Sequence, residues 1–146
     1  MYTLVSMRTG RIDWLEVFIY SAIMPLTEDR ITSRYSISAY NSEQIVINQQ
    51  AYRQSLILSP ESIHCPWPVQ SIDDLDESSL QIVLEMHPTV VLLGTGQQQQ
   101  FPDPVIFTLF GQQGIGLEVM NTGALCRTFN ILVAEDREVV AAIILG

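Results

Sequence analysis

The sequence predicts an α/β fold: a three-layer domain whose mixed, mainly parallel five-stranded sheet carries helices on both faces. The continuous apolar run at residues 89–93 is typical of a strand buried on both faces, and residues 115–120, apolar apart from Glu118, are interpreted as a second buried strand. Segments with apolar residues at helical spacing alternate with these runs. Because strand–helix–strand units form right-handed crossovers between parallel strands, we expect the order ββαβαβαβ or one close to it.

The chain has 146 residues, which is enough for one domain with an adequate core. We place this single α/β domain at residues 31–146. Residues 1–30 are predicted to be an N-terminal extension, either loosely packed or partly preceding a native start at Met24. An ordinary amphipathic helix at residues 14–23 is the competing interpretation of this region.

The first part of the domain is predicted to be β structure. Residues 36–40 alternate polar and apolar side chains, as a lead-in or edge strand does. Two short apolar runs follow, at residues 44–48 and 55–59. We expect these two runs to pair as a hairpin whose long loop is formed by residues 49–54.

A proline-rich segment and an acidic run lead into the first helix. Three prolines exclude regular structure between residues 60 and 69, and Trp67 between two of them is expected to be a rigid, partly buried plug. The acidic run at residues 71–77 is interpreted as a solvated helix start rather than a metal site, because acidic side chains stabilise the first turn of a helix. This helix is expected to bury Leu80, Val83 and Leu84 and to end at His87.

The second half of the chain supplies the alternating units. Residues 104–110 and 122–134 have helical spacing of apolar side chains, and residues 137–145 form the predicted final strand. Glycines and prolines separate these segments, and no internal repeat is present.

Charge and composition exclude several function classes. The net charge is −9, and the basic residues are seven arginines with no lysine. An acidic chain without a basic patch is a poor binder of nucleic acids and of anionic membranes. No apolar run reaches the ~20 residues of a membrane-spanning helix. Two cysteines are too few for a disulfide framework, so a reducing, cytoplasmic location is expected.

Two glycine-containing loops are candidate binding sites, because ligands of open α/β sheets bind beyond the carboxyl ends of strands. One loop is Gly94-Thr95-Gly96, and the other is Asn121-Thr122-Gly123. If the strands before them are parallel neighbours, both loops open on one edge. Glycine lets the backbone approach a ligand closely. Because the third glycine of a dinucleotide fingerprint and the P-loop lysine are missing, a plain tight turn is the competing interpretation.

Arg127 is the candidate cation of this edge. Gly123, Arg127 and Asn130 share one small or polar stripe of the predicted helix, which Asn121 or Thr122 caps. The helix N-terminus and Arg127 together can hold a carboxylate or a phosphate. The competing role is structural: Glu118 lies in a strand expected to be buried, and a buried Glu118 requires Arg127 as its ion-pair partner.

Cys126 is the one candidate nucleophile, because a thiolate is favoured near the start of a helix. Thiol catalysis also needs a base, and the two histidines, His64 and His87, lie in loop or helix-end contexts. A buried, inert cysteine is therefore favoured. We predict no catalytic residue, no metal site and no cofactor.

The chain resembles a family of small domains of unknown function, of the MTH type, that includes the mitochondrial assembly factor for respiratory complex I. The resemblance covers residues 35–145 and implies a three-layer fold with a mixed five-stranded sheet, but no established catalytic residue. The chain departs from the family pattern at Leu125, where alanine is usual, and at Phe129, where tyrosine is usual. The matching segments are Pro66-Trp67, residues 91–96, Phe101-Pro102, residues 114–116, 118–122 and 126–130, Leu132, Glu135, Arg137 and residues 139–143.

Three functional hypotheses follow. The first is a non-enzymatic interaction or assembly protein with an exposed apolar face and a protein partner such as a respiratory complex subunit; a homo-oligomer is compatible with it. The second is a small-molecule or anion-binding module. The third is an enzyme that uses Cys126. The candidate binding residues of the second hypothesis are Gly94, Thr95, Gly96, Glu118, Thr122, Gly123, Arg127 and Asn130.

Overall fold

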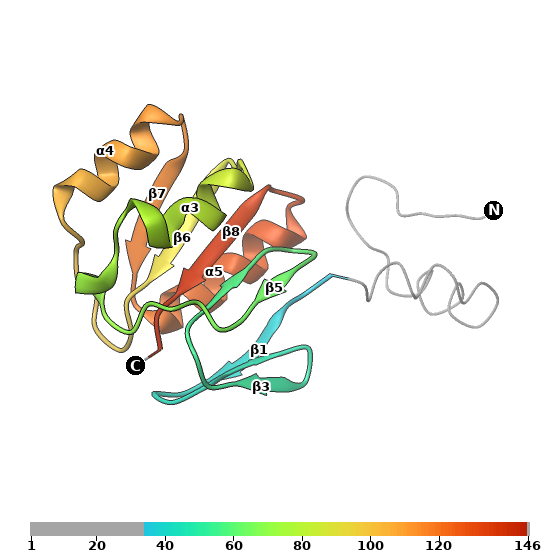
Figure 1. Cartoon of the computed structure of the whole chain (residues 1–146). Coiled ribbons are helices and arrows are strands. Elements are labelled where there is room, and N and C mark those ends of the chain that lie inside the picture. The colour runs from blue at the N-terminus through green and yellow to red at the C-terminus, as the bar shows by residue number, and fades with distance from the viewer. Residues whose placement is uncertain (1–33, 146) are drawn as a thin grey trace, which may run out of the picture. The chain divides into compact units, whose positions relative to one another are not determined.

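A computed structural model describes residues 34–145, so the extension expected at residues 1–30 lies outside the described part of the chain. A five-stranded sheet in the order β5-β4-β8-β6-β7 organises this part (Figure 1). β6 is parallel to both β7 and β8, whereas β4 is antiparallel to both β5 and β8. The predicted mixed five-stranded sheet is therefore confirmed, but the expectation that it is mainly parallel is wrong, because two of its four strand pairings are antiparallel. Its strands are β4 (Leu56–Leu58), β5 (Ile63–His64), β6 (Val90–Gly94), β7 (Gly116–Met120) and β8 (Val139–Ile143).

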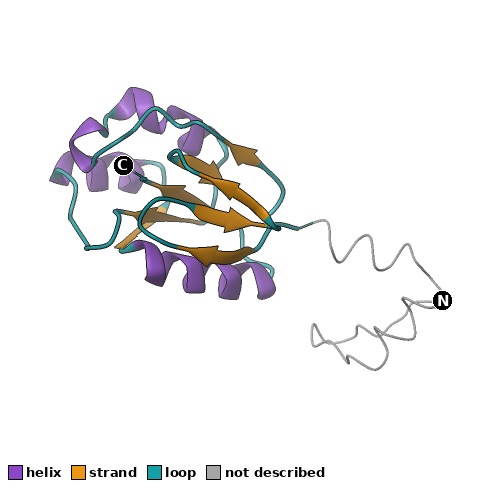
Figure 2. Ribbon diagram, turned by 90° about the horizontal axis from the view of Figure 1, so that it is seen from below, coloured by secondary structure: helices purple, strands orange, loops and turns teal. Residues whose placement is uncertain are grey.

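Helices cover both faces of this sheet, as predicted (Figure 2). α3 (Glu77–Glu85) and α4 (Pro104–Gln112) pack on one face, and α5 (Thr122–Ala134) packs on the other. The core is accordingly divided into two halves by the alternating side chains of the strands. Leu80 and Phe110 belong to the first half, and Leu125 and Phe129 belong to the second.

A second, three-stranded sheet lies on the α5 side and was not predicted. It consists of β1 (Ile37–Tyr40), β2 (Ile45–Ile47) and β3 (Gln50–Tyr52), all antiparallel. Ile37, Ile45 and Ile47 are buried in the same half of the core as α5. Within residues 34–145, five strands precede α3 and belong to two different sheets, whereas the expected order ββαβαβαβ placed only two strands before the first helix of the domain.

The predicted hairpin between residues 44–48 and 55–59 is wrong. β2 turns at once into β3 through Asn48 and Gln49, whose φ angles are 47° and 73°. Positive φ at both central residues is the geometry of a type I′ hairpin turn. Because β2 and β3 pair with each other, β4 is left to pair with β5 and β8.

The helices agree well with the sequence prediction. α5 has the predicted bounds, and α4 ends two residues later than predicted. The acidic run forms a short 3-10 turn, η2 (Ile72–Asp74), and the start of α3, where the Asp76 carboxylate accepts the Ser79 N–H at 2.8 Å. Across residues 34–145, no helix has both the length and the apolar character needed to cross a membrane.

Candidate functional site

An open cleft of about 1020 Å³ lies at the carboxyl ends of β6, β7 and β8. The loop at residues 95–100, the turn at residues 121–123 and the turn after β1 at residues 40–42 form its walls. The first two are joined by hydrogen bonds: the Thr95 N–H donates to Met120 O at 3.0 Å, and the Thr122 N–H donates to Gly96 O at 2.8 Å. The two glycine loops therefore do open on one edge of the sheet, as expected.

The first turn of α5 forms the base of the cleft. Asn121 caps the helix, because its side-chain oxygen accepts the Ala124 N–H at 2.8 Å. Gly123 lies directly under Tyr40: a Cβ at position 123 would come within 2.5 Å of the Tyr40 hydroxyl. The absence of a side chain at position 123 therefore lets the Tyr40 hydroxyl lie against the first turn of α5. The sequence did not reveal Tyr40 as a site residue, because nothing in residues 36–40 indicates that their strand lies beside α5.

Hydroxyl groups play two different roles in the cleft. The Thr95 hydroxyl shapes the loop after β6, since it donates to Gln98 O at 2.8 Å and accepts the Gln100 N–H at 3.0 Å. Thr122 is only 5% exposed, and no hydrogen bond within residues 34–145 engages its hydroxyl. Since Thr122 also lines the cleft, its hydroxyl is available to a bound molecule.

Arg127 provides the charge of the cleft. It is exposed, and it is the one charged side chain among the described residues that line this space. Hydroxyls, side-chain amides and backbone groups make up the remaining polar lining. In a chain of net charge −9, such a cleft is a local positive site that favours an anion or a neutral polar group.

The predicted buried ion pair between Glu118 and Arg127 is wrong. Both side chains are exposed, no ion pair joins them, and Glu118 does not line the cleft. The reason is topological: β7 is the edge strand of the sheet, so its side chains are not enclosed on both sides. Arg127 is accordingly accessible, as the binding hypothesis requires.

Gly94 also lies outside the cleft lining and serves packing instead. A Cβ at position 94 would come within 2.8 Å of the Leu125 Cδ1 atom. The missing side chain therefore lets α5 lie close against β6, which positions the first turn of the helix at the cleft.

Asn130 has a structural role as well. Its side-chain oxygen accepts the Ile37 N–H at 2.9 Å, and its side-chain amide donates to Ile37 O at 2.8 Å. The Asn130 side chain thus bonds to both backbone groups of Ile37, as a neighbouring strand would, and it fixes β1 and the second sheet to α5. It does not line the cleft.

We expect Asn130→Ala to lower the free energy of unfolding by about 1–3 kcal/mol, because two partly buried backbone groups of Ile37 lose their partners. Urea unfolding measures this change. Asn130→Asp keeps the acceptor and loses the donor, so it should also destabilise the fold. If both variants unfold like the parent chain, Asn130 does not fix β1.

Cys126 lies in the apolar half of the core that contains α5. Burial raises the pKa of its thiol to about 11, although the neighbouring Arg127 partly opposes the shift. The thiol is therefore protonated at neutral pH and lacks the thiolate character of a nucleophile. The favoured interpretation of Cys126 as a buried cysteine is confirmed.

Thiol labelling tests this environment. Cys65 is half-buried, so a maleimide should modify Cys65 in the folded chain and Cys126 only after denaturation, as intact mass measures. The unfolded thiol ionises near its ordinary pKa of 9.0 and the folded one near 11, so stability should fall as pH rises between these values. Cys126→Ala should remove that loss. Rapid labelling of Cys126 in a folded Cys65→Ser variant would contradict the buried position.

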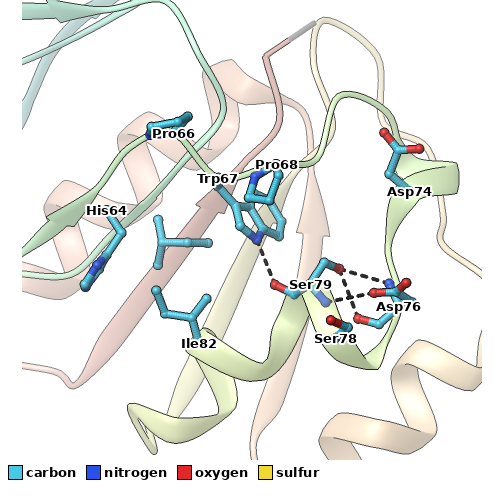
Figure 3. Close-up of a pocket in the computed structure, with 10 residues that line it drawn as sticks. His64, Pro66, Trp67, Pro68, Asp74, Asp76, Ser78, Ser79 and Ile82 are labelled. Carbon is cyan, nitrogen blue, oxygen red and sulfur yellow. Dashed lines mark hydrogen bonds between the residues drawn. The ribbon is translucent and has the colours of Figure 1, made fainter.

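A second pocket, of about 450 Å³, is lined in part by Trp67 (Figure 3). His64 lies on one side of Trp67, and the carboxylates of Asp74 and Asp76 lie on the other. Asp74 accepts the N–H groups of Gln70 and Ser71, at 2.9 and 3.2 Å, and Asp76 caps α3. Because the histidine and the carboxylates are separated and the latter are engaged, this pocket offers no acid–base pair.

The family model described as "protein of unknown function (DUF498/DUF598)" matches residues 37–144. Among curated proteins, the chain is 28% identical over 123 residues to the "13 kDa major membrane protein" of Francisella tularensis, covering 84% of this chain and all of the relative. It is 34% identical over 110 residues to NADH dehydrogenase (ubiquinone) 1 alpha subcomplex assembly factor 3 of Xenopus tropicalis. That match covers 74% of this chain and 60% of the frog protein. The chain thus spans less than two thirds of the frog assembly factor.

Solved structures agree with these matches. A Xanthomonas campestris protein is 38% identical, with a TM-score of 0.74 and coverage of 84% of this chain and 93% of the other. A Bordetella pertussis protein described as an Mth938-like domain is 29% identical, with a TM-score of 0.68 and coverage of 78% and 87%. The α/β fold is therefore the one that these bacterial domains share.

Proposed function

The chain belongs to the DUF498/DUF598 family, and from this membership we propose that it is a non-enzymatic interaction protein in the assembly of a respiratory complex. The observation that carries the proposal is its similarity to proteins named as assembly factors of NADH dehydrogenase, at 34% identity for the frog relative. The family model matches residues 37–144, which lie within the α/β domain, so the proposal concerns this domain.

The surface of the domain supports an interaction role. Phe101 and Val105 are 69% and 61% exposed; Phe101 lies in the loop just before α4, and Val105 lies in the first turn of that helix. Large apolar side chains that cluster on a surface are typical of protein-binding sites. The protonated, buried thiol of Cys126 supports the non-enzymatic part of the proposal, because it removes the strongest candidate nucleophile.

Affinity co-purification from the source cells, with the membranes solubilised, tests this function. The full chain carries a tag, and mild cross-linking retains weak complexes. We expect a subunit of NADH dehydrogenase or of another respiratory complex among the recovered proteins. Recovery of the tagged, folded chain without any respiratory subunit would count against the assembly role.

A second function, the binding of a small anion, is favoured by one specific observation. The cleft brings the unpartnered Thr122 hydroxyl and the single charge of Arg127 together at the start of α5. Donors and a positive charge at a helix N-terminus suit a carboxylate or a phosphate. Neither Glu118 nor Asn130 belongs to this second site, because both lie outside the lining.

Titration with inorganic phosphate, followed by amide chemical shifts of the full chain, tests the second function. The amides of Gly96, Thr122 and Gly123 should shift in the parent chain and should not shift in Arg127→Ala. Arg137→Ala is the matched control, since Arg137 is an exposed arginine outside the cleft. Unchanged spectra, or equal shifts in both variants, would refute an anion site at Arg127.

A further inference from the structure

A second surface feature, separate from the cleft, lies between η2, the start of α3 and α4. It is an apolar groove of about 330 Å³. Ile72, Leu75 and Leu109 are half-buried in it, and Phe101 and Val105 stand exposed along it. These five side chains are called the apolar groove below. α3 and α4 lie on the same face of the sheet (Figure 1), and residues of both helices line the groove.

Carboxylates surround the apolar groove. Asp73, Asp76, Glu77 and Asp103 line it, and no arginine or histidine of the described residues does. Two of these carboxylates are fixed by the backbone: Asp76 accepts the Ser79 N–H at 2.8 Å, and Asp103 accepts the Val105 N–H at 3.0 Å. The groove therefore combines an apolar floor with negative charges at defined positions around it.

From this combination we infer that the apolar groove docks a basic amphipathic helix of a protein partner. Apolar side chains on one face of such a helix would pack against Phe101, Val105 and Leu109. Lysines or arginines beside them would pair with the surrounding carboxylates. The inference rests on the proposed interaction function, for which it names the contact surface and the chemistry of the partner.

Charge complementarity selects this occupant over three others. A second copy of the chain would bring the same four carboxylates against one another across a symmetric contact. The chain's own residues 1–33 contain four carboxylates and three arginines, so that segment has no excess of basic side chains to match the groove. An anionic membrane surface would be repelled by the same carboxylates.

The test uses a synthetic peptide of leucines and lysines at helical spacing, about four turns long, added to the full chain. The amides of Phe101, Val105 and Leu109 should shift, and affinity should fall when salt is raised, because the charge pairs are exposed. Phe101→Ser should weaken binding about tenfold or more, as loss of an aromatic anchor does. A peptide with glutamate in place of lysine should not bind.

Matched variants separate specific docking from a general effect. Ile131→Ser removes an apolar side chain of similar exposure on α5, outside the groove, and should leave affinity unchanged. Asp73→Asn with Glu77→Gln should weaken binding, whereas Glu85→Gln, at the far end of α3, should not. The inference is overturned if the peptide shifts no amides, or only amides outside the groove. It is also overturned if Phe101→Ser binds the peptide as tightly as the parent chain does. If Phe101→Ser still recovers a respiratory subunit from cells, the groove is not the docking site, while the proposed assembly function stands.

Discussion

Leu125→Ala should lower the free energy of unfolding by about 2–5 kcal/mol, the range for removing a fully buried leucine from a packed core. Leu125 lies in the first turns of α5 and packs directly on Gly94 of β6. The truncation leaves a cavity at the contact that positions the helix start beside the cleft. Urea unfolding of the full chain measures the change.

Gly94→Ala tests the same contact from the strand. Its Cβ would come within 2.8 Å of Leu125 Cδ1, and the buried leucine has little room to move, so we expect a loss of about 1–3 kcal/mol from overpacking. In the double variant, the alanine at position 94 fills part of the cavity left at position 125. The free energy of unfolding of the double variant should therefore fall by clearly less than the sum of the two single decreases. Strict additivity would mean that the two side chains do not share this space.

The second large effect is expected at Trp67: Trp67→Ala should lower the free energy of unfolding by about 3–5 kcal/mol. Trp67 is 4% exposed and belongs to the half of the core beneath α3 and α4. Its indole N–H donates to Ser79 O at 2.8 Å (Figure 3). Its backbone N–H donates to Ser55 O, also at 2.8 Å. The indole thus ties the proline-rich segment to α3 as well as filling the core.

Trp67→Phe separates the two contributions of the indole. It keeps most of the ring but leaves the partly buried Ser79 carbonyl without its donor, so we expect the free energy of unfolding to fall by about 1–3 kcal/mol. Ser79→Ala is the control, because it removes the hydroxyl that bonds to the Asp76 backbone and leaves the Ser79 carbonyl in place. If Trp67→Phe is as costly as Trp67→Ala, packing of the ring does not contribute as proposed.

The sequence predicted those parts of the fold whose signals are local. α5 combines an Asn121 cap with a regular apolar spacing, and its bounds were obtained without error. The glycine loops after β6 and β7 were also placed on one edge correctly, because parallel pairing of successive strand–helix–strand units is a strong rule. Trp67 was identified as a plug, although it is buried more completely than expected.

The errors concern features that depend on distant pairing. Nothing in the run containing Glu118 reveals that β7 is an edge strand, since its apolar composition resembles that of the enclosed β6. The turn at Asn48 and Gln49 contains no glycine, so its left-handed geometry was not recognised. Asn130 shared a polar stripe with Arg127, but its partner Ile37 is 93 residues away. Tyr40 and the acidic, apolar groove likewise arise only when separate elements meet.

The central claim is that this domain acts in the assembly of a respiratory complex without catalysing a reaction. Deletion of its gene in the source cells, followed by native gel analysis of NADH dehydrogenase, tests that claim most directly. We predict reduced assembled enzyme in the deletion strain and full restoration by both the parent chain and Cys126→Ala. An unchanged amount of assembled enzyme after deletion would contradict the assembly role, and restoration by the parent chain but not by a stably folded Cys126→Ala would contradict the non-enzymatic one.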